Sequence, residues 1–443
     1  MSNDGQYDLI VIGAGLAGSE VAWAAAQAGR RVRLYEMRPV RHTPAHRTDM
    51  CGELVCSNSF RSNAPDNAVG MLKEEMRRLG SLIMQVAEET KIPAGKGLAI
   101  DRERFAEGIT ARLQSHPLIT LQREEVTSLR ALAEQYQRPL VVASGPLTAE
   151  ALAADIRSLT HAEDLYFYDS MAPLLATASL DPAQMFRASR YGVGEDYLNA
   201  PMSRAEYQKF VMAVAQAEKV PPRHFEDPKY FEGCLPIEVM AERGIETLRH
   251  GPMKPFGLKD PRTGREPYAV VQLRFDNRAE TIVNMVGFQT RMTWPEQQRI
   301  LRTITGLATA EFLRMGAMHR NTYLNAPKLL DPTFALRSAP WPVQFAGQIT
   351  GVEGYVESAA IGLYVGLLQV GRLRSAPPLA TALGALTEHV TNGNHLKFEP
   401  MNANWGLTPP LPAHVPYQTR KAAYRDRARQ EMIHWLKEEG FAG

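Results

Sequence analysis

The chain has few cysteines and no long apolar segment. Only three of its 443 residues are cysteines, too few for the disulfide framework that stabilises many small secreted domains. No apolar run reaches the ~18 residues of a membrane helix; the longest, residues 359–368, follows Glu357. No basic-then-apolar signal segment precedes the first predicted strand. These absences exclude a disulfide scaffold and predict a cytoplasmic protein without membrane contact.

A net charge of one sign and metal-binding motifs are also absent. The 50 Lys and Arg residues nearly balance the 48 Asp and Glu residues, so the formal net charge is only +2 and no chain-wide basic field attracts an acidic partner. One basic cluster, residues 420–429, falls on a predicted helix, and both a solvated helix face and an RNA-binding patch are compatible with it. The sequence contains no H-E-x-x-H or C-x-x-C pattern, so we expect no metal.

The N-terminal region predicts a strand, a glycine-rich turn, a helix and a second strand. The strands are residues 7–12 and 31–36, and the second ends at Glu36. The turn has the pattern G-x-G-x-x-G and consists of Gly13, Ala14, Gly15, Leu16, Ala17 and Gly18. Its first glycine permits a tight turn, its second the approach of a pyrophosphate, and its third the packing of the helix on the strand. The helix N-terminus attracts phosphates, and Glu36 is placed to accept hydrogen bonds from ribose hydroxyls. The unit predicts dinucleotide binding, and its glycine spacing favours FAD or NAD over S-adenosylmethionine.

A second glycine-rich turn, late in the chain, suits another contact to the same cofactor. It joins a predicted strand at residues 343–346 to a helix of small residues at 358–366. FAD fits this arrangement better than NAD, because its ribityl and isoalloxazine portions extend far from the first glycine turn. A plain helix-entry turn is the alternative. The candidate cofactor residues of the second turn are Gly347, Gln348, Gly351 and Gly354.

The remaining patterns place these units in one fold. Apolar spacing predicts a helix over residues 68–90, Asp101 is expected to cap a helix over 102–114, and residues 139–146 read as a buried strand. Residues 164–305 are rich in Tyr, Phe, Met and Pro and include a predicted strand at 269–274. We therefore predict an α/β chain with a discontinuous FAD-binding Rossmann fold of the glutathione-reductase type and an inserted α+β domain. The predicted division is residues 1–163 and 306–443 for the two parts of the FAD-binding domain, the second with a C-terminal helical region, and residues 164–305 for the inserted substrate domain.

The cysteines allow two chemistries. Cys51 and Cys56 form a C-x4-C pattern, which suggests the redox-active disulfide of a flavin disulfide reductase. That class needs a second G-x-G-x-x-G for NAD(P)H, and none follows residue 18. The alternative pairs Cys56 with Cys234, which Gly233 and Pro236 hold on a constrained turn. A thiolate there is a strong nucleophile, and its addition to C6 of uracil prepares C5 to take a one-carbon unit. The alternative is that Cys234 is a buried, unreactive residue of the core.

Colinear segments over nearly the whole chain resemble the folate- and FAD-dependent tRNA uracil-5-methyltransferases (TrmFO), a family related to GidA (MnmG). In chain order they are residues 11–39, 53–59, 93–95, 231–238, 250–255, 286–290, 345–355 and 402–407. The Glu53-Leu54-Val55-Cys56-Ser57-Asn58 and Cys234-Leu235-Pro236 segments are the specific parts of the resemblance. The glycine turn alone is common to many flavoproteins.

The resemblance implies transfer of the methylene group of 5,10-methylenetetrahydrofolate to C5 of a T-loop uridine in tRNA, with electrons from FAD that NAD(P)H has reduced. It implies that Cys234 attacks uracil C6 and that Cys56 acts near the flavin, as proton acceptor at C5 or as a trap for a flavin–methylene species. Cys51 falls outside the family pattern and is expected to be incidental.

The resemblance makes the T-arm of tRNA, folate and NAD(P)H the expected partners. Basic and aromatic residues of the inserted domain and the C-terminal helix are expected to contact tRNA. Trp294 and Trp405 are candidates to stack on pterin or uracil, although a place in the core is the more common role of such residues. Two other functions stay open: a flavin-dependent NAD(P)H oxidoreductase acting on a small molecule or thiol, and a non-enzymatic FAD protein that binds tRNA.

Overall fold

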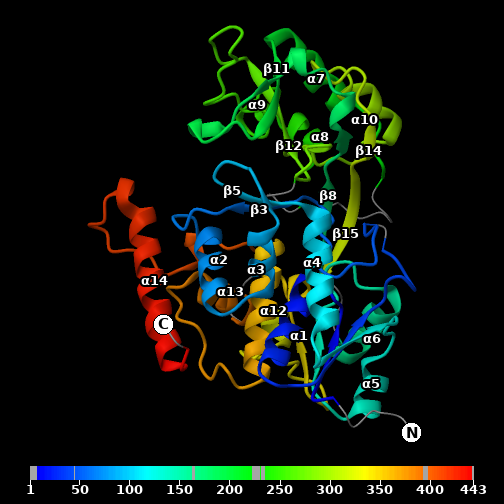
Figure 1. Ribbon diagram of the computed structural model, residues 1–443, viewed down its shortest axis with the longest axis vertical. Helices are drawn as coiled ribbons and strands as arrows, with labels where there is room; N and C mark the ends of the chain where they lie inside the picture. The colour runs from blue at the N-terminus through cyan, green and yellow to red at the C-terminus, as the bar shows by residue number, and fades with distance from the viewer. Residues whose placement is uncertain are drawn as a thin grey trace.

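The chain folds into two units joined by a pair of long strands (Figure 1). The joining strands, β8 (Leu165–Met171) and β15 (Ala317–Tyr323), pair antiparallel between the units. The computed structural model describes residues 7–43, 45–161, 165–221, 230, 235–392 and 398–441. No helix within these ranges has the length and apolar character needed to cross a membrane.

A five-stranded parallel sheet forms the centre of the larger unit. Its strands, in the order β16-β7-β1-β2-β6, are Val343–Phe345, Leu140–Val142, Leu9–Ile12, Val32–Glu36 and Ile119–Arg123. The strands predicted at the N-terminus, at 139–146 and at 343–346 are confirmed. In register, Ile12 lies opposite both Tyr35 and Val142, and Val142 also lies opposite Phe345. The carboxyl ends of four strands therefore meet at one edge, where open α/β sheets bind nucleotides.

Two helices made largely of small residues pack face to face beside this sheet. They are α1 (Leu16–Gln27) and α12 (Tyr355–Gln369). A Cβ atom on Gly362 of α12 would lie 2.3 Å from the carbonyl oxygen of Ala17, and one on Gly366 would lie 2.9 Å from the Cα of Val21. Because only glycine permits such an approach, the small residues of the predicted helix are explained by its contact with α1.

The helical stretch predicted over residues 68–90 is confirmed, and the structure divides it into two helices. They are α2 (Ala68–Arg78) and α3 (Leu82–Glu89). Gly80 between them has a positive φ of 82°, and the Ser81 hydroxyl accepts the N–H of Met84 at 3.0 Å and so caps α3. The predicted Asp101 cap is confirmed: its carboxylate accepts the N–H of Arg104 at 3.2 Å at the start of α4 (Arg102–Ser115).

The other helices of the larger unit flank this core. They are α5 (Leu129–Tyr136), α6 (Glu150–Thr160), α11 (Ala326–Leu329), α13 (Ala382–Thr391) and α14 (Arg420–Glu438). A small sheet of β3 (Ser59–Ser62), β5 (Gly97–Ile100) and β4 (Lys91–Ile92) lies where the two units meet (Figure 1).

The smaller unit is built on a six-stranded sheet with its own apolar core. Its strands, in the order β10-β11-β12-β13-β9-β14, are Phe186–Arg187, Tyr197–Met202, Ala269–Phe275, Ile282–Met285, Leu174–Ala176 and Phe312–Arg314. Its helices are α7 (Arg204–Gln216), α8 (Ile237–Glu242), α9 (Thr247–His250) and α10 (Trp294–Leu301). The predicted strand at 269–274 is confirmed. This sheet extends to Arg314, past residue 305, at which the sequence predicts the inserted domain to end.

Candidate functional site

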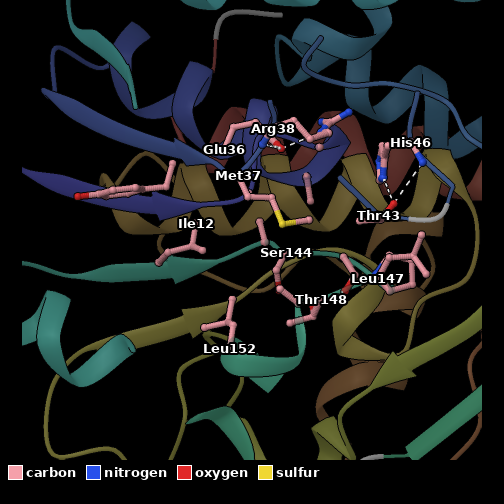
Figure 2. Close-up of a pocket in the computed structure, with 18 of the residues that line it drawn as sticks. Ile12, Glu36, Met37, Arg38, Thr43, His46, Ser144, Leu147, Thr148 and Leu152 are labelled. Atoms are coloured by element: carbon pink, nitrogen blue, oxygen red, sulfur yellow. Dashed lines mark hydrogen bonds and ion pairs between the residues drawn. The ribbon is translucent and has the colours of Figure 1, made fainter. Parts of the chain in front are cut away.

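A cleft opens at the carboxyl edge of the parallel sheet, over the first glycine turn. Its walls come from the turn between β1 and α1, the end of β2, the segment after β7 and the start of α12. Figure 2 shows Glu36 and Arg38 on one side of this cleft and Ser144 and Thr148 across from them. Segments distant in sequence thus build one elongated site.

The first glycine turn leaves an open cradle at the start of α1. A Cβ atom on Gly15 would meet no atom within 4 Å, so this position is free for a ligand. The other two glycines are tightly enclosed: a Cβ on Gly13 would lie 2.6 Å from the Ala143 oxygen, and one on Gly18 would lie 1.7 Å from the Gly13 oxygen. Since α1 begins at Leu16, its unpaired N–H groups face the same space, and the cradle fits a pyrophosphate.

Glu36 is held rigidly beside this cradle. Its carboxylate accepts the N–H of Ala14 at 3.1 Å, and the N–H and Nε of Arg38 at 3.1 and 2.8 Å. Burial opposes ionisation of this carboxyl, but the Arg38 guanidinium and the backbone donors outweigh it and hold the pKa of Glu36 below its ordinary value. Arg38 also donates to Glu53 at 2.9 Å. Glu36 is therefore an ionised acceptor, as a ribose contact requires.

The far end of this wall carries a neutral histidine. His46 Nδ1 lies 2.6 Å from the hydroxyl of Thr43 (Figure 2). Burial, and then the positive charge of Arg38, lower the pKa of His46 to about 4. The imidazole is uncharged at neutral pH, so it offers a hydrogen-bonding group without adding charge.

The second glycine turn meets the first. A Cβ atom on Gly347 would lie 2.6 Å from the Cβ of Ala17, and Gln348 lines the cleft. Gly351 serves packing instead, because a Cβ there would lie 2.3 Å from the ring of Phe398. A Cβ atom on Gly354 would lie 2.5 Å from a carboxylate oxygen of Glu357. Thus the structure brings Gln348 of the second turn to the cleft and leaves Gly347, Gly351 and Gly354 out of its lining.

Cys56 lies on a loop fastened to the edge of the cleft. The hydroxyl of Tyr355 accepts the N–H of Cys56 at 2.6 Å and that of Ser57 at 3.1 Å. Tyr355 and Val55 both line the cleft, and the Cys56 sulfur lies 3.9 Å from the carbonyl oxygen of Ser170 on β8. The thiol is partly exposed, so it lies at the boundary between the cleft and the smaller unit.

Two arginines from different units hold the same loop. Arg102 of α4 donates to the carbonyl of Leu54 at 2.7 Å, and Arg314 of β14 donates to those of Val55 and Cys56 at 2.7 and 3.1 Å. Arg102 also forms a two-pronged ion pair with Asp276, with both N–O distances 2.9 Å. The loop thus takes its shape from both units.

The other two cysteines have different surroundings. Cys51 is fully buried and is not in a disulfide with Cys56. Burial raises the pKa of its thiol to about 11, so Cys51 is unreactive, and the C-x4-C disulfide finds no support. Cys234 lies outside the described residues. The helix after it is anchored: Ile237 donates to the Gln289 carbonyl at 2.8 Å, and buried Glu238 accepts the Thr290 hydroxyl at 2.9 Å.

The candidate stacking and RNA-binding residues divide into engaged and exposed groups. Trp405 is stacked on Tyr424, with ring centres 5.4 Å apart and an angle of 10° between the planes, and its suggested contact with pterin or uracil stays a prediction. Arg425 and Arg429 of α14 pair with Asp66 and Glu74, each at 2.7 Å. Two of the five basic residues in the predicted cluster, residues 420–429, therefore dock α14 on the larger unit. Trp294, by contrast, is 64% exposed.

Several residues that shape this site could not be identified from the sequence. Tyr355 ends one of the family-like segments, but nothing in its neighbourhood marks it as the acceptor for the Cys56 loop. Arg102 and Arg314 carry no local signal, because their partners are 48 and 259 positions away.

Known protein families and relatives that are similar to this chain agree with this geometry. A family model described as "Glucose inhibited division protein A" (GIDA) matches residues 8–377. The methylenetetrahydrofolate–tRNA-(uracil-5-)-methyltransferase TrmFO of Geobacter sulfurreducens is 56% identical over 432 residues, which cover 96% of this chain and 98% of that protein. TrmFO of Moorella thermoacetica is 51% identical over 440 residues, 98% and 99% of the two chains.

A solved structure shares the fold. GidA of Aquifex aeolicus is 16% identical, covers 100% of this chain and 75% of its own length, and superposes with a TM-score of 0.71. Together with the glycine cradle and the parallel sheet, this likeness establishes an FAD-binding Rossmann-type α/β fold. The chain belongs to the TrmFO family, within the wider GidA family of flavoproteins.

Proposed function

We propose that this protein methylates C5 of a T-loop uridine in tRNA, with 5,10-methylenetetrahydrofolate as the one-carbon donor and FAD, reduced by NAD(P)H, as the source of electrons. The relatives that carry this enzyme name match the chain over nearly its full length. The observation that carries the proposal is the position of Cys56, fastened by Tyr355 to the edge of the cleft. A reactive thiol beside a dinucleotide site is what such a reaction needs.

The cofactor residues are proposed from the cleft. Gly13 to Gly18 and the N-terminus of α1 bind the pyrophosphate, Glu36 accepts from the ribose, and Gly347 and Gln348 contact the cofactor from the second turn. The open position at Gly15 and the ionised Glu36 both fit FAD. Bound FAD, once NAD(P)H has reduced it, would supply the two electrons that turn a transferred methylene into a methyl group. Gly351 and Gly354 act indirectly, by shaping the second turn.

The two catalytic cysteines are proposed from the family pattern. The thiolate of Cys234 adds to C6 of the uracil, and the electron pair released toward C5 makes that carbon nucleophilic. Cys56 accepts the proton that leaves C5 or traps the one-carbon unit near the flavin. The smaller unit, predicted as residues 164–305 and continued by β14 to Arg314, is the proposed substrate domain. The larger unit, predicted as residues 1–163 and 306–443, is the proposed FAD-binding domain in two parts. The T-loop base must leave its stack to reach the thiols. We place the protein in the cytoplasm.

The test is the formation of 5-methyluridine in an unmodified tRNA transcript by the purified protein. One sample receives methylenetetrahydrofolate and NADPH, and a parallel sample receives S-adenosylmethionine instead. We expect product only with folate, and we expect Cys234→Ala to abolish it while FAD stays bound. NADPH oxidation that requires neither folate nor tRNA, without any 5-methyluridine, would instead indicate a small-molecule oxidoreductase.

A further inference from the structure

Three buried arginines surround the Cys56 loop, and we call Arg102, Arg274 and Arg314 the cationic socket. Arg274 and Arg314 are only 7% and 6% exposed, and the side chain of Arg102 is 15% exposed. They come from three elements of the two units, α4, β12 and β14. Guanidiniums are rarely collected in a protein interior unless negative charge compensates them.

The negative charge supplied by the described residues does not match the socket. The carboxylate that acts on all three guanidiniums is Asp276, and its oxygens are already paired with Arg102. Arg274 donates to the neutral side chain of Asn58 at 2.8 Å. Arg314 bonds only backbone carbonyls, and its Nε has no hydrogen-bond partner among the described residues. Within the described part of the chain, the carboxylates near the socket therefore leave room for a further anion.

The group placed to supply this charge is the sulfur of Cys56. Negative charge on Cys56 favours the charged form of each of the three arginines. Burial lowers the pKa of Arg314 to about 10, and the nearby charge of Arg102 acts in the same direction. Among the described residues, Tyr355 also faces Cys56. Burial raises the pKa of Tyr355 above its ordinary value, so its hydroxyl remains neutral.

We propose that the cationic socket keeps the sulfur of Cys56 as a thiolate in the resting protein, and that Arg314 is its positioning residue. This deepens the proposed function, on which it rests for the task of the thiolate. Both roles open to Cys56 need the deprotonated sulfur: a thiolate takes the C5 proton to become S–H, or uses its free electron pair to bond the one-carbon unit. A thiol can do neither.

The test measures how the alkylation of Cys56 by iodoacetamide depends on pH in the flavin-loaded protein, without folate or tRNA. The thiolate forms an S–C bond as iodide leaves, and peptide mass spectrometry separates Cys56 from Cys51 and Cys234. We expect a midpoint at least about one pH unit below the ordinary thiol value of roughly 8.5. A midpoint at the ordinary value would overturn the proposal, whatever the variants do.

The variants separate charge from shape. Arg314→Met should raise the midpoint by about one pH unit or more and slow alkylation at neutral pH by about tenfold. Arg314→Lys keeps the charge and should stay within about half a unit of the natural protein. The matched control is Arg302→Met, because Arg302 also binds a carbonyl, that of Ala310 at 3.0 Å, but lies outside the socket. Bound flavin and thermal unfolding verify that each variant is folded.

Two results with the variants would also contradict the proposal. The first is a folded Arg314→Met protein with an unchanged midpoint, and the second is an equal shift in Arg314→Lys, which would make Arg314 purely structural. The proposed function fails separately: a low midpoint in a protein that forms no 5-methyluridine would support the socket and refute the methyltransferase.

Discussion

The hydroxyl of Tyr355 and the backbone N–H of Cys56, 299 positions apart in the chain, form a hydrogen bond of 2.6 Å. Tyr355 begins α12, directly after the second glycine turn. The bond therefore ties the late part of the FAD-binding fold to the cysteine loop near the start. A ligand that orders the second turn would therefore also restrain the backbone of the loop that carries the Cys56 thiol.

Tyr355→Phe should remove this hydrogen bond without preventing the binding of FAD. The substitution leaves two N–H groups, those of Cys56 and Ser57, without their acceptor, at a cost of about 1–3 kcal/mol in the free energy of unfolding. We expect methylation to fall while FAD remains bound, as measured by single-turnover 5-methyluridine formation and flavin absorbance. Tyr364→Phe, also on α12 and buried, is the control. Equal losses in both variants would contradict the specific role of Tyr355.

Two alanine substitutions in the first glycine turn should affect different properties, FAD affinity at Gly15 and stability at Gly18. At Gly15 the added methyl group meets no protein atom and the φ of −74° suits alanine, so the free energy of unfolding of the apoprotein should change by less than about 0.5 kcal/mol. The methyl would occupy the cradle, and FAD affinity should fall about tenfold or more. At Gly18 the methyl would lie 1.7 Å from the Gly13 oxygen, so Gly18→Ala should destabilise the fold by at least about 1–3 kcal/mol. Flavin titration and thermal unfolding check both; normal FAD binding by Gly15→Ala would refute the cradle.

The parts of the fold that could be predicted from the sequence are those that local chemistry determines. The strand before Gly13 and the strand that ends at the carboxylate of Glu36 follow from one short pattern. Asp101 caps a helix by accepting the N–H of Arg104, three residues later. The helical stretch over 68–90 could be predicted, but its division into α2 and α3 could not, because the apolar spacing continues past Gly80, whose left-handed conformation follows the end of α2.

The site was harder to predict, because its shape depends on contacts between distant segments. The cysteine loop follows from its own motif, but the groups that hold it come from distant segments. Tyr355 and Arg102 belong to other elements of the larger unit, and Arg314 belongs to the smaller unit. Trp405 shows the reverse: a residue that the sequence offers for ligand stacking is taken up by Tyr424 and by a 2.8 Å bond to the Asp66 carbonyl.

The arginines that anchor α14 should matter for stability rather than for tRNA. Arg429 forms a two-pronged pair with Glu74, at 2.8 and 2.7 Å. Arg429→Ala should lower the free energy of unfolding by about 0.2–1 kcal/mol and leave tRNA affinity within about twofold. Lys421 has no ion-pair partner among the described residues, so Lys421→Ala should weaken tRNA binding and reduce its salt dependence by about one counterion. Filter binding at several salt concentrations compares the two; a stronger loss in Arg429→Ala would contradict this division.

A buried lysine should make stability rise with pH above neutrality. Lys73 of α2 is fully buried and donates to the carbonyls of Phe60 and Ser62 at 2.7 and 2.5 Å. Burial, and then the charge of Arg61, lower its pKa to about 7, whereas an unfolded lysine titrates near about 10.4. Between these values the unfolded chain binds more protons than the folded one, so the free energy of unfolding increases with pH.

The comparison with Lys73→Met isolates this contribution, because other groups titrate alike in both proteins. The stability of the natural protein relative to the variant should grow by up to about 1.4 kcal/mol per pH unit from about pH 7 toward about pH 10, as measured by urea unfolding. The increase should vanish below about pH 7, where the lysine is protonated in both states. A difference that stays flat across this window, or falls as pH rises, would show that Lys73 keeps its proton in the folded protein and that Glu357, which acts on it in the opposite direction to Arg61, dominates its surroundings.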